Sequence, residues 1–387
     1  MIVFLVFLFL IVYCYAGYPL AVWAVSQIFE KPVRKSPICP DIAIVVAAWN
    51  EQDVMEQKIR NLLSLDYPVQ KMEIWIGSDG STDRTEDIVR SFSDDRVKLL
   101  AGRDRRGKPA MLNDVMSRVQ AEIVVFTDAR QTFDPQTVRE LVANFSDPSV
   151  GCASGELMFR EKEGATAKGV NLYWNYEKFL RRCESRIHSI LGATGAIYAI
   201  RRSLFSPVPD QVVLDDMFVP FQIIRRGYRS VFDETAKAYD DVAANSQEEH
   251  RRKARTLFGN YQIFGLFPDL FFPWRSPIAI QLFSHKFLRV VAPFLLIAIF
   301  VLNLFLLDSL LMRAVAVLQI VFYTMALTGG LARNRNCGIL SGLSRLCYAP
   351  YVFCLLNFSA VIGFLRFVGS KQQVTWQKAR DIDGREK

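Results

Sequence analysis

The first 29 residues of this chain of 387 lack any charged side chain. A helix crosses a bilayer with about 20 predominantly apolar residues, and this stretch is longer than that. A cleaved signal peptide is the competing interpretation, but no Lys or Arg precedes the apolar run, which continues past the length of a signal peptide's apolar region. We therefore predict a retained transmembrane anchor at 1–29.

Paired cysteines are also lacking. The seven cysteines are scattered, with no C-x-x-C pair and no zinc-type spacing. This pattern argues against a cysteine zinc site or a disulfide framework and agrees with a reducing compartment. Internal repeats and low-complexity linkers are lacking too, so solenoid and linker-rich architectures are not indicated.

Nucleic-acid-binding motifs are lacking as well. Lys and Arg number 47 against 39 Asp and Glu, a net charge of +8. Such an excess can indicate nucleic-acid binding, but no matching motif or aromatic–basic platform accompanies it. We expect no nucleic-acid partner, and we expect the positive charges to face membrane lipids and an anionic phosphate substrate.

The middle of the chain has the pattern of an α/β domain. Apolar runs of strand length alternate with amphipathic stretches of helical length, the runs at 42–48, 72–77 and 122–127, the stretches at about 51–64, 83–93 and 108–120. Further helices are expected at about 166–188, after Asp216 and at 247–267. Short buried strands separated by helices predict a mainly parallel sheet with helices on both faces.

Three further apolar runs, at about 288–307, 310–332 and 346–367, predict C-terminal membrane spans. We expect an anchor at 1–29, a cytoplasmic domain at 38–270, an interfacial segment at 271–287, about three transmembrane helices at 288–368 and a basic tail at 369–387. Lys31, Arg34 and Lys35 follow the anchor closely, which favours a cytoplasmic domain. Three C-terminal spans would put the basic tail outside, against the same tendency.

Polar residues follow each predicted strand, at the edge where α/β sheets bind ligands. After the second strand comes Ser-Asp-Gly-Ser-Thr-Asp at 78–83. A simple strand-to-helix turn explains Gly80 and the residues after it, but leaves Asp79, whose carboxylate could accept the N–H of a uracil ring. Lys108 begins a helix together with Pro109, so it is either a phosphate ligand at the helix N-terminus or a solvated lysine.

The remaining candidates are carboxylates and arginines. Asp128 follows the third strand and could hold Mg²⁺ or Mn²⁺, which prefer oxygen ligands. Asp215 and Asp216 begin a helix, where they either favour its dipole or provide a general base whose pKa its neighbour raises. Arg252 and Arg255 are three residues apart, so on a helix they share a face that could clamp a phosphate or lie on lipid headgroups.

The order of these residues resembles the family 2 glycosyltransferases, in particular the integral-membrane branch that includes synthases of cellulose, hyaluronan and poly-N-acetylglucosamine. Asn50-Glu51 is similar to the family's Asn-Glu after the first strand, and residues 78–83 to its Asp-Asp-Gly-Ser-x-Asp. Residues 108–113 resemble Lys-x-x-Ala-Leu-Asn, Asp128 stands first in Asp-x-Asp, and Asp215-Asp216 stand at the Glu-Asp before the acceptor helix. The resemblance covers about residues 38–290.

The resemblance implies a GT-A fold and inversion of the anomeric centre in one displacement. Asp216 would be the base that deprotonates the acceptor hydroxyl, and Asp128 the ligand of a metal–diphosphate. The nucleotide-sugar would contact a set of residues along the strand ends and the basic helix: Asn50, Glu51, Asp79, Lys108, Asp128, Arg252 and Arg255. Gly195 and Gln262 are expected on the acceptor side.

Two departures from the family pattern matter. The second carboxylate of Asp-x-Asp is replaced by Arg130, so the metal would depend on Asp128, diphosphate oxygens and water. The processive members carry Gln-x-x-Arg-Trp, whose Trp stacks on the acceptor sugar, whereas this chain has Thr256 at that position after Arg255.

We therefore expect a membrane glycosyltransferase that moves a hexose or N-acetylhexosamine from a UDP-sugar to a saccharide or lipid-linked acceptor. Exopolysaccharide or cell-envelope glycan synthesis at a bacterial inner membrane is the expected setting. Three alternatives stay open: transfer of a single sugar to a lipid-linked acceptor, a catalytically silent nucleotide-sugar-binding partner, and a transporter with a nucleotide-sensing domain.

Overall fold

The fold was analysed in a computed structural model, which describes residues 1–160, 165–241, 246–332 and 341–369. The side chains at 165–173, 241, 246–253, 332 and 341–345 are not described, although their backbone is. The basic tail expected at 369–387 lies outside the described residues except for Gly369.

The middle of the chain folds around one eight-stranded sheet in the order β3-β2-β1-β4-β7-β6-β8-β5. The strands are β1 (Ile42–Ala48), β2 (Met72–Ser78), β3 (Val97–Ala101), β4 (Ile123–Thr127), β5 (Thr132–Phe133), β6 (Val150–Arg160), β7 (Tyr198–Arg201) and β8 (Arg229–Asp241). Strands β3, β2, β1 and β4 run parallel, as does β6 beside β8, while β7 is antiparallel to both of its neighbours.

Every residue of β1 is buried, because helices cover both faces of the sheet. Ile42, Ile44 and Val46 face a core completed by α3 (Gln52–Leu63) and α6 (Thr137–Ala143). Ala43 and Val45 face the opposite core, completed by α5 (Lys108–Met116) and α8 (Asp215–Arg225). The unbroken apolar run of β1 follows from this burial on two sides.

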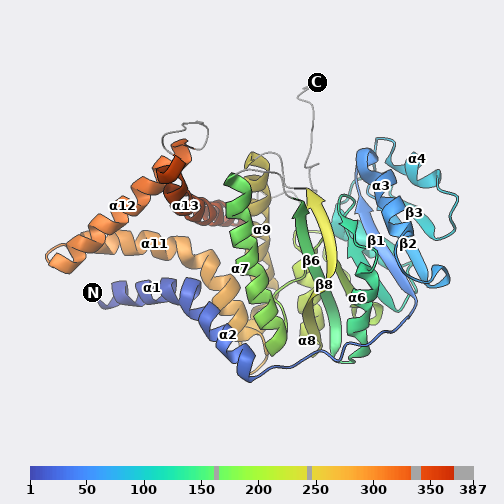
Figure 1. The fold of residues 1–387 in the computed structure, drawn as a ribbon, viewed down its shortest axis with the longest axis horizontal. Coiled ribbons are helices and arrows are strands. Elements are labelled where there is room, and N and C mark those ends of the chain that lie inside the picture. Colours follow the sequence, from blue (N-terminus) through green and yellow to red (C-terminus); the bar gives the residue numbers. More distant parts are fainter. Residues whose placement is uncertain (161–164, 242–245, 333–340, 370–387) are drawn as a thin grey trace.

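Two long helices, α7 (Ala165–Ile187) and α9 (Ser246–Leu266), stand between the sheet and the apolar helices (Figure 1). Helix α7 packs on α2 (Tyr18–Ile28), and α9 packs on α13 (Ser341–Val368). The short elements are α4 (Thr85–Arg90) and 3-10 turns at Val69–Lys71, Asn144–Ser146, Arg202–Leu204 and Pro268–Phe271.

The described part of the chain contains four helical segments long and apolar enough to cross a membrane: Ile2–Ile28, Ala279–Leu304, Leu310–Leu331 and Leu346–Val368. The first joins α1 (Ile2–Val12) to α2 through a π-helical turn at Tyr13–Gly17. The second joins α10 (Ala279–Gln281) through a π-helical turn at Leu282–Phe287 to α11 (Leu288–Leu304), and α12 (Leu310–Ala332) follows.

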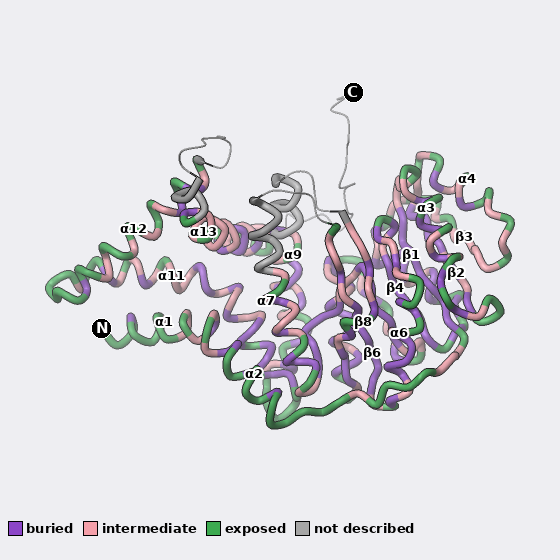
Figure 2. The backbone as a smooth tube through the Cα atoms, in the orientation of Figure 1, coloured by how far each residue is buried: buried purple, intermediate pink, exposed green. Residues whose placement is uncertain are grey.

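Many residues of these segments are exposed (Figure 2), and large apolar residues are prominent among them. In α12, Leu318 and Leu327 are about two thirds exposed, at 67% and 66%. An exposed apolar surface of this extent marks a membrane or interaction surface. Together with their length, it indicates a membrane protein.

The strands expected at 42–48, 72–77 and 122–127 are confirmed as β1, β2 and β4. The α/β sheet with helices on both faces is confirmed as well, with the antiparallel β7 in its second half. The apolar helix expected to start near 288 already begins at Ala279, so part of the segment assigned to the interface is continuous with a candidate span.

Candidate active site

The carboxyl ends of β1, β2 and β4 meet at one edge of the sheet, because these strands are parallel neighbours. Asn50 follows β1 with a φ of 54°, a conformation that Asn adopts more readily than most residues. Its Oδ1 accepts the backbone N–H of Thr82 at 2.8 Å, and its own N–H donates to Ser81 Oγ at 3.1 Å. The backbone N–H of Glu51 donates to Thr85 Oγ1 at 2.9 Å. Asn50 and Glu51 thus tie the turn after β1 to the turn after β2.

Asp79 follows β2 and is fully buried. Its two oxygens accept the backbone N–H groups of Arg106 and Gly107, both at 2.8 Å. The carboxylate therefore holds the loop at 102–107 over the sheet edge, a structural role that the sequence did not indicate. Its contact with a nucleobase stays a prediction.

That loop is strongly basic, with arginines at 103, 105 and 106 before Lys108. The guanidinium of Arg105 lies 3.4 Å from the centre of the Trp49 ring, so the loop after β3 stacks on the turn after β1. Gly80 allows the loop to come this close: a Cβ there would lie 2.9 Å from the backbone N of Arg105.

Lys108, at the start of α5, brings two of the predicted carboxylates together. Its Nζ lies 2.9 Å from Asp128 Oδ1 and 3.4 Å from Asp215 Oδ2. Burial alone would lower the pKa of the ammonium, but Asp128 and Asp215 raise it, so Lys108 is a permanent cation. Of the two interpretations of Lys108, the solvated lysine is excluded by these contacts and by a side-chain exposure of 19%.

Asp215 and Asp216 open helix α8. Burial and the negative charge of Asp215 raise the pKa of Asp216 to about 6, against the opposing effect of Lys108. The glycine-rich turn at 192–195 packs against Asp216: Ala193 N–H donates to the backbone carbonyl of Asp216 at 2.7 Å. A Cβ at Gly195 would lie 3.0 Å from Asp216 Oδ2, so Gly195 borders the predicted base.

Arg255 reaches the same cluster from α9. Burial lowers the pKa of its guanidinium, while Asp215, Asp216 and Asp128 act in the opposite direction. Its buried Nε has no hydrogen-bond partner among the described residues. A buried unpaired donor beside a cluster of charges is a place for an anionic ligand.

Arg252 and Gln262, the other two residues predicted on α9, are not placed at the cluster in the same way. The side chain of Arg252 lies outside the described residues. Gln262 accepts the N–H of Val213 at 3.0 Å and donates to the carbonyl of Gln211 at 2.6 Å. Both ends of its amide therefore brace the loop before α8, and its contact with an acceptor stays a prediction.

The donor set for a divalent cation is sparse. Asp128 is 38% exposed, and although burial alone would raise its pKa, Lys108, Arg130 and Lys58 hold that pKa below its usual range. In the ranges that the structure describes, no three His, Cys, Asp or Glu side chains form a group able to hold a metal ion. Mg²⁺ is commonly held by one or two carboxylates with phosphates and water. A cation bound in this way, with Asp128 as its protein ligand, stays a prediction.

Three residues near this cluster were missed from the sequence. Arg181 of α7 donates to Thr194 Oγ1 at 2.6 Å and so ties α7 to the turn over Asp216. Tyr198 of β7 is fully buried below the cluster, and burial with the charges of Asp215 and Asp216 raises the pKa of its hydroxyl. Lys58 of α3 lies behind Asp128. Of the three, only Lys58 could have been noticed in the sequence, because it occupies a core position of the helical pattern formed by Met55, Ile59 and Leu62.

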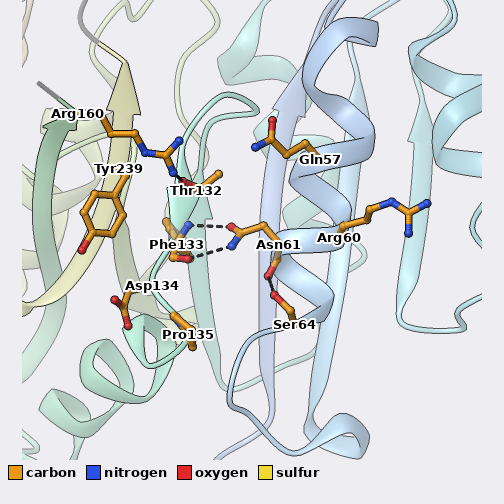
Figure 3. Close-up of a pocket in the computed structure, with 10 residues that line it drawn as sticks. All are labelled: Gln57, Arg60, Asn61, Ser64, Thr132, Phe133, Asp134, Pro135, Arg160 and Tyr239. Atoms are coloured by element: carbon orange, nitrogen blue, oxygen red, sulfur yellow. Dashed lines mark hydrogen bonds between the residues drawn. The ribbon is translucent and has the colours of Figure 1, made fainter. Parts of the chain in front are cut away.

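A separate groove of about 480 Å³ lies beside α3, β5 and the ends of β6 and β8 (Figure 3). Its lining includes Arg60, Asn61, Phe133, Arg160 and Tyr239. None of the predicted site residues lines it, so it is distinct from the carboxylate cluster.

Residues 43–208 match the family described as Glycosyl transferase family 2. The matched segment is less than half of the chain and is similar to a family 2 glycosyltransferase domain, which supports a glycosyltransferase enzyme.

Its relatives include the probable glycosyltransferase YdaM of Bacillus subtilis, 25% identical over 281 residues, which are 69% of this chain and 67% of that one. A poly-beta-1,6-N-acetyl-D-glucosamine synthase of Staphylococcus aureus is 24% identical over 269 residues, 66% of this chain and 63% of the synthase. A beta-monoglucosyldiacylglycerol synthase of Synechocystis is 34% identical over 116 residues, 29% of this chain and 24% of that one. The chain thus spans about two thirds of the length of the first two relatives.

Among solved structures, the mannosyltransferase PcManGT of Pyrobaculum calidifontis, in complex with GDP-Man and Mn²⁺, superposes with a TM-score of 0.71. The superposition covers 96% of this chain and all of that one, at 21% identity. At this identity the likeness concerns the fold alone, and the predicted GT-A fold with flanking apolar helices is confirmed.

Proposed function

We propose that the chain transfers a hexose or N-acetylhexosamine from a UDP-sugar to a saccharide or lipid-linked acceptor, with inversion at the anomeric carbon. The observation that carries this proposal is the contact of one permanent cation, Lys108, with both Asp128 and Asp215, beside an Asp216 whose pKa is raised to about 6. Such a cluster combines a site for phosphate with a carboxylate basic enough to take a proton near neutral pH.

In the proposed reaction, the acceptor hydroxyl oxygen attacks the anomeric carbon from the side opposite the diphosphate. The bond from that carbon to the diphosphate oxygen breaks, and the hydroxyl proton passes to the Asp216 carboxylate. Asp215 keeps the pKa of Asp216 high by its charge. Gly195, which borders Asp216, leaves room on the acceptor side, where Gln262 is also proposed to lie.

The diphosphate would be held by Lys108 and by Arg255, whose Nε has no partner in the described part of the chain. Arg252 is proposed to add a second guanidinium. A bound Mg²⁺ or Mn²⁺, held through Asp128, would supply positive charge that stabilises the diphosphate as it leaves. Asn50, Glu51 and Asp79 are proposed to form the nucleotide side of the site.

We infer that the domain at 38–270 is cytoplasmic, in a bacterial inner membrane, with 1–29 and the apolar helices between 279 and 368 crossing the bilayer, 271–278 at the interface and 369–387 as the tail. Lys31, Arg34 and Lys35 support this orientation, since positive charge after a span favours the cytoplasmic side. Nucleotide-sugars supplied from the cytoplasm would then reach the carboxylate cluster directly.

The test is a donor screen with the full chain purified in detergent or nanodiscs. Nucleoside diphosphate release is measured for UDP- and GDP-sugars, with saccharide and lipid-linked acceptors, with and without Mn²⁺ and Mg²⁺. We expect release with a UDP-sugar that depends on acceptor and on the divalent cation. Release with GDP-sugars alone would overturn the proposed donor, and no release with any donor would favour a silent binding partner or a transporter.

Transfer of a single sugar is the second candidate, favoured by Thr256 at the position where the processive pattern has Trp. Product length with a labelled donor separates the two versions. A ladder of products indicates a polymerising synthase, and one added sugar indicates a single-transfer enzyme.

A further inference from the structure

Lys58 is a buried cation on the core face of α3. Its side chain is 1% exposed, and its neighbours on that face, Met55, Ile59 and Leu62, are fully buried apolar residues. An ammonium group in such surroundings destabilises a fold unless hydrogen bonds or charges compensate it. A lysine at a position that would suit Leu or Met therefore needs a specific reason.

Its Nζ lies 4.7 Å from the centre of the Phe133 ring, and both of its hydrogen bonds are to the segment that carries Asp128. Lys58 Nζ donates to Thr127 Oγ1 at 2.8 Å and to the Gln131 carbonyl at 2.7 Å. An ammonium group can only donate, so the Thr127 hydroxyl accepts from it. That hydroxyl therefore has its own proton free to donate to the Asp128 carbonyl, 3.3 Å away. Lys58 thus closes the base of the turn at 127–131.

No carboxylate forms an ion pair with Lys58 among the described residues. Burial lowers the pKa of its ammonium to about 7, while Asp128 and Asp240 raise it through space. The effect is mutual, since the charge of Lys58 also helps to keep the pKa of Asp128 low. In its protonated form, Lys58 therefore directs a positive charge at the turn from the face of the sheet opposite to Lys108.

We propose that Lys58 is a positioning residue for the donor diphosphate: it fixes the turn that presents Asp128 and places a positive charge behind it. This inference rests on the proposed function, in which Asp128 faces a metal–diphosphate. It also fits the composition of the turn, where Arg130 stands in place of the family's second carboxylate. The turn then depends on one carboxylate, and the orientation of that carboxylate decides how the donor binds.

Asn61 provides a matched control, because it lies three residues further along the same face of α3. Its amide accepts the Phe133 N–H at 2.8 Å and donates to the Phe133 carbonyl at 2.9 Å (Figure 3). It therefore anchors β5, just after the turn, and within the described part of the chain it forms no hydrogen bond with Thr127, Asp128 or Gln131. We expect the loss of Asn61 to loosen β5 and to leave the hydrogen bonds of the turn intact.

The experiment compares Lys58→Met, Lys58→Gln and Asn61→Ala in the full chain. Donor KM, kcat and the Mn²⁺ concentration for half-maximal activity are measured, with Tm as a check of folding. For Lys58→Met we expect about a tenfold rise in donor KM and in the Mn²⁺ requirement, the scale of one lost charge interaction in a partly shielded site. Lys58→Gln can still hydrogen-bond to the turn, so its donor KM and Mn²⁺ requirement should lie between those of the wild type and Lys58→Met. It provides the test if Lys58→Met does not fold.

Asn61→Ala is expected to lower Tm, with KM and the Mn²⁺ requirement changed less than about twofold, since the two hydrogen bonds that it loses hold β5 and not the turn. Unchanged KM and Mn²⁺ curves in both Lys58 variants would overturn the proposal. Equal changes in Asn61→Ala and the Lys58 variants would also overturn it, because they would reduce Lys58 to a structural residue.

Calorimetric binding of UDP with Mn²⁺, and of UDP alone, separates this inference from the proposed function, because binding needs no turnover. Weaker UDP–Mn²⁺ binding in both Lys58 variants supports the inference even if no acceptor is found for the wild type. Wild-type turnover combined with equal UDP–Mn²⁺ affinity in all variants refutes the inference and leaves the proposed function standing.

Discussion

At the scale of single residues, Asp216 combines a burial penalty with a like-charged neighbour, and both raise its pKa to about 6. A general base acts only when it is unprotonated, so its pKa sets the acid limb of the pH profile. We expect kcat/KM to fall about tenfold per pH unit below about pH 6. A pH profile measured with saturating metal, with Tm followed at each pH, checks this, and a flat profile down to pH 5 would contradict the assignment.

The raised pKa of Asp216 also makes the stability of the folded protein depend on pH. The pKa of Asp216 in the folded protein lies above its ordinary value, so the native state keeps a proton that the unfolded state releases. The folded protein is therefore stabilised by this proton at low pH and loses that stabilisation as the pH rises toward about 6. Asp216→Asn should therefore lower kcat about 10²–10⁴-fold and raise Tm at pH 7–8. If Asp216→Asn lowers Tm as well as kcat, Asp216 has a structural role instead.

The site could be predicted from sequence only as far as residue types at strand ends allow. Asp79, Lys108, Asp128 and Asp215 were found because each follows a strand or begins a helix. What could not be foreseen was the direction in which each side chain points. Asp79 turns toward the loop at 106–107, because two unpaired backbone N–H groups there need an acceptor.

At the scale of elements, burial decides which strands the sequence reveals. Strands β1 and β4 are buried throughout and read as unbroken apolar runs. Strand β3 is largely half-exposed, and β8 contains a polar stretch with a register irregularity against β6, so neither has a run of that kind. The pairing of β7 between β4 and β6 joins residues far apart in the chain and depends on the whole fold.

Helix α7 is the element that connects the turn over Asp216 to the membrane helices. On one side Arg181 binds Thr194; on the other, Glu184 Oε1 accepts from Tyr18 Oη at 2.7 Å and lies 2.6 Å from His285 Nδ1. Glu177 pairs with His285 and Arg289, and although burial alone would raise its pKa, these partners hold it well below its usual range. Removing one partner of a buried ion pair leaves an uncompensated charge, which strongly destabilises the fold.

We predict that Glu184→Leu destabilises the protein by about 3 kcal/mol, because the buried Tyr18 hydroxyl and His285 ring both lose their partner and each such loss costs about 1–3 kcal/mol. Tyr18→Phe removes one hydrogen bond and should cost about 1 kcal/mol. Thermal melting of the detergent-purified variants checks the order. A Glu184→Leu variant as stable as Tyr18→Phe would show that the cluster between α2, α7 and α10–α11 contributes little to stability.

At the scale of the whole molecule, the catalytic and membrane halves share a packed interface. Helix α9, which carries Arg255, lies against α13 where a Cβ on Gly363 would come within 2.9 Å of Leu257 Cβ. Tyr261 of α9 stacks on Phe367 of α13 with ring centres 5.7 Å apart. On its other side, α9 packs Gly259 against Leu214, which directly precedes Asp215 and Asp216 of the carboxylate cluster.

A change at the membrane face of α9 should therefore reach the carboxylate cluster. Gly363→Leu would push α13 away from α9, because the close approach leaves no room for a side chain. We expect about a tenfold loss of kcat/KM and a fall in Tm, since overpacking of this kind typically costs 1–3 kcal/mol. The control is Phe358→Leu, an apolar change on the same helix at a side chain that is 59% exposed, which should leave both quantities near wild type.

Activity of these two variants is measured in nanodiscs, so that both keep a lipid surround. If Gly363→Leu lowers Tm but not kcat/KM, the membrane helices only anchor the enzyme. If Tm and kcat/KM both fall while Phe358→Leu is unaffected, the position of Arg255 depends on α13. The membrane helices then help to hold the proposed active site in place.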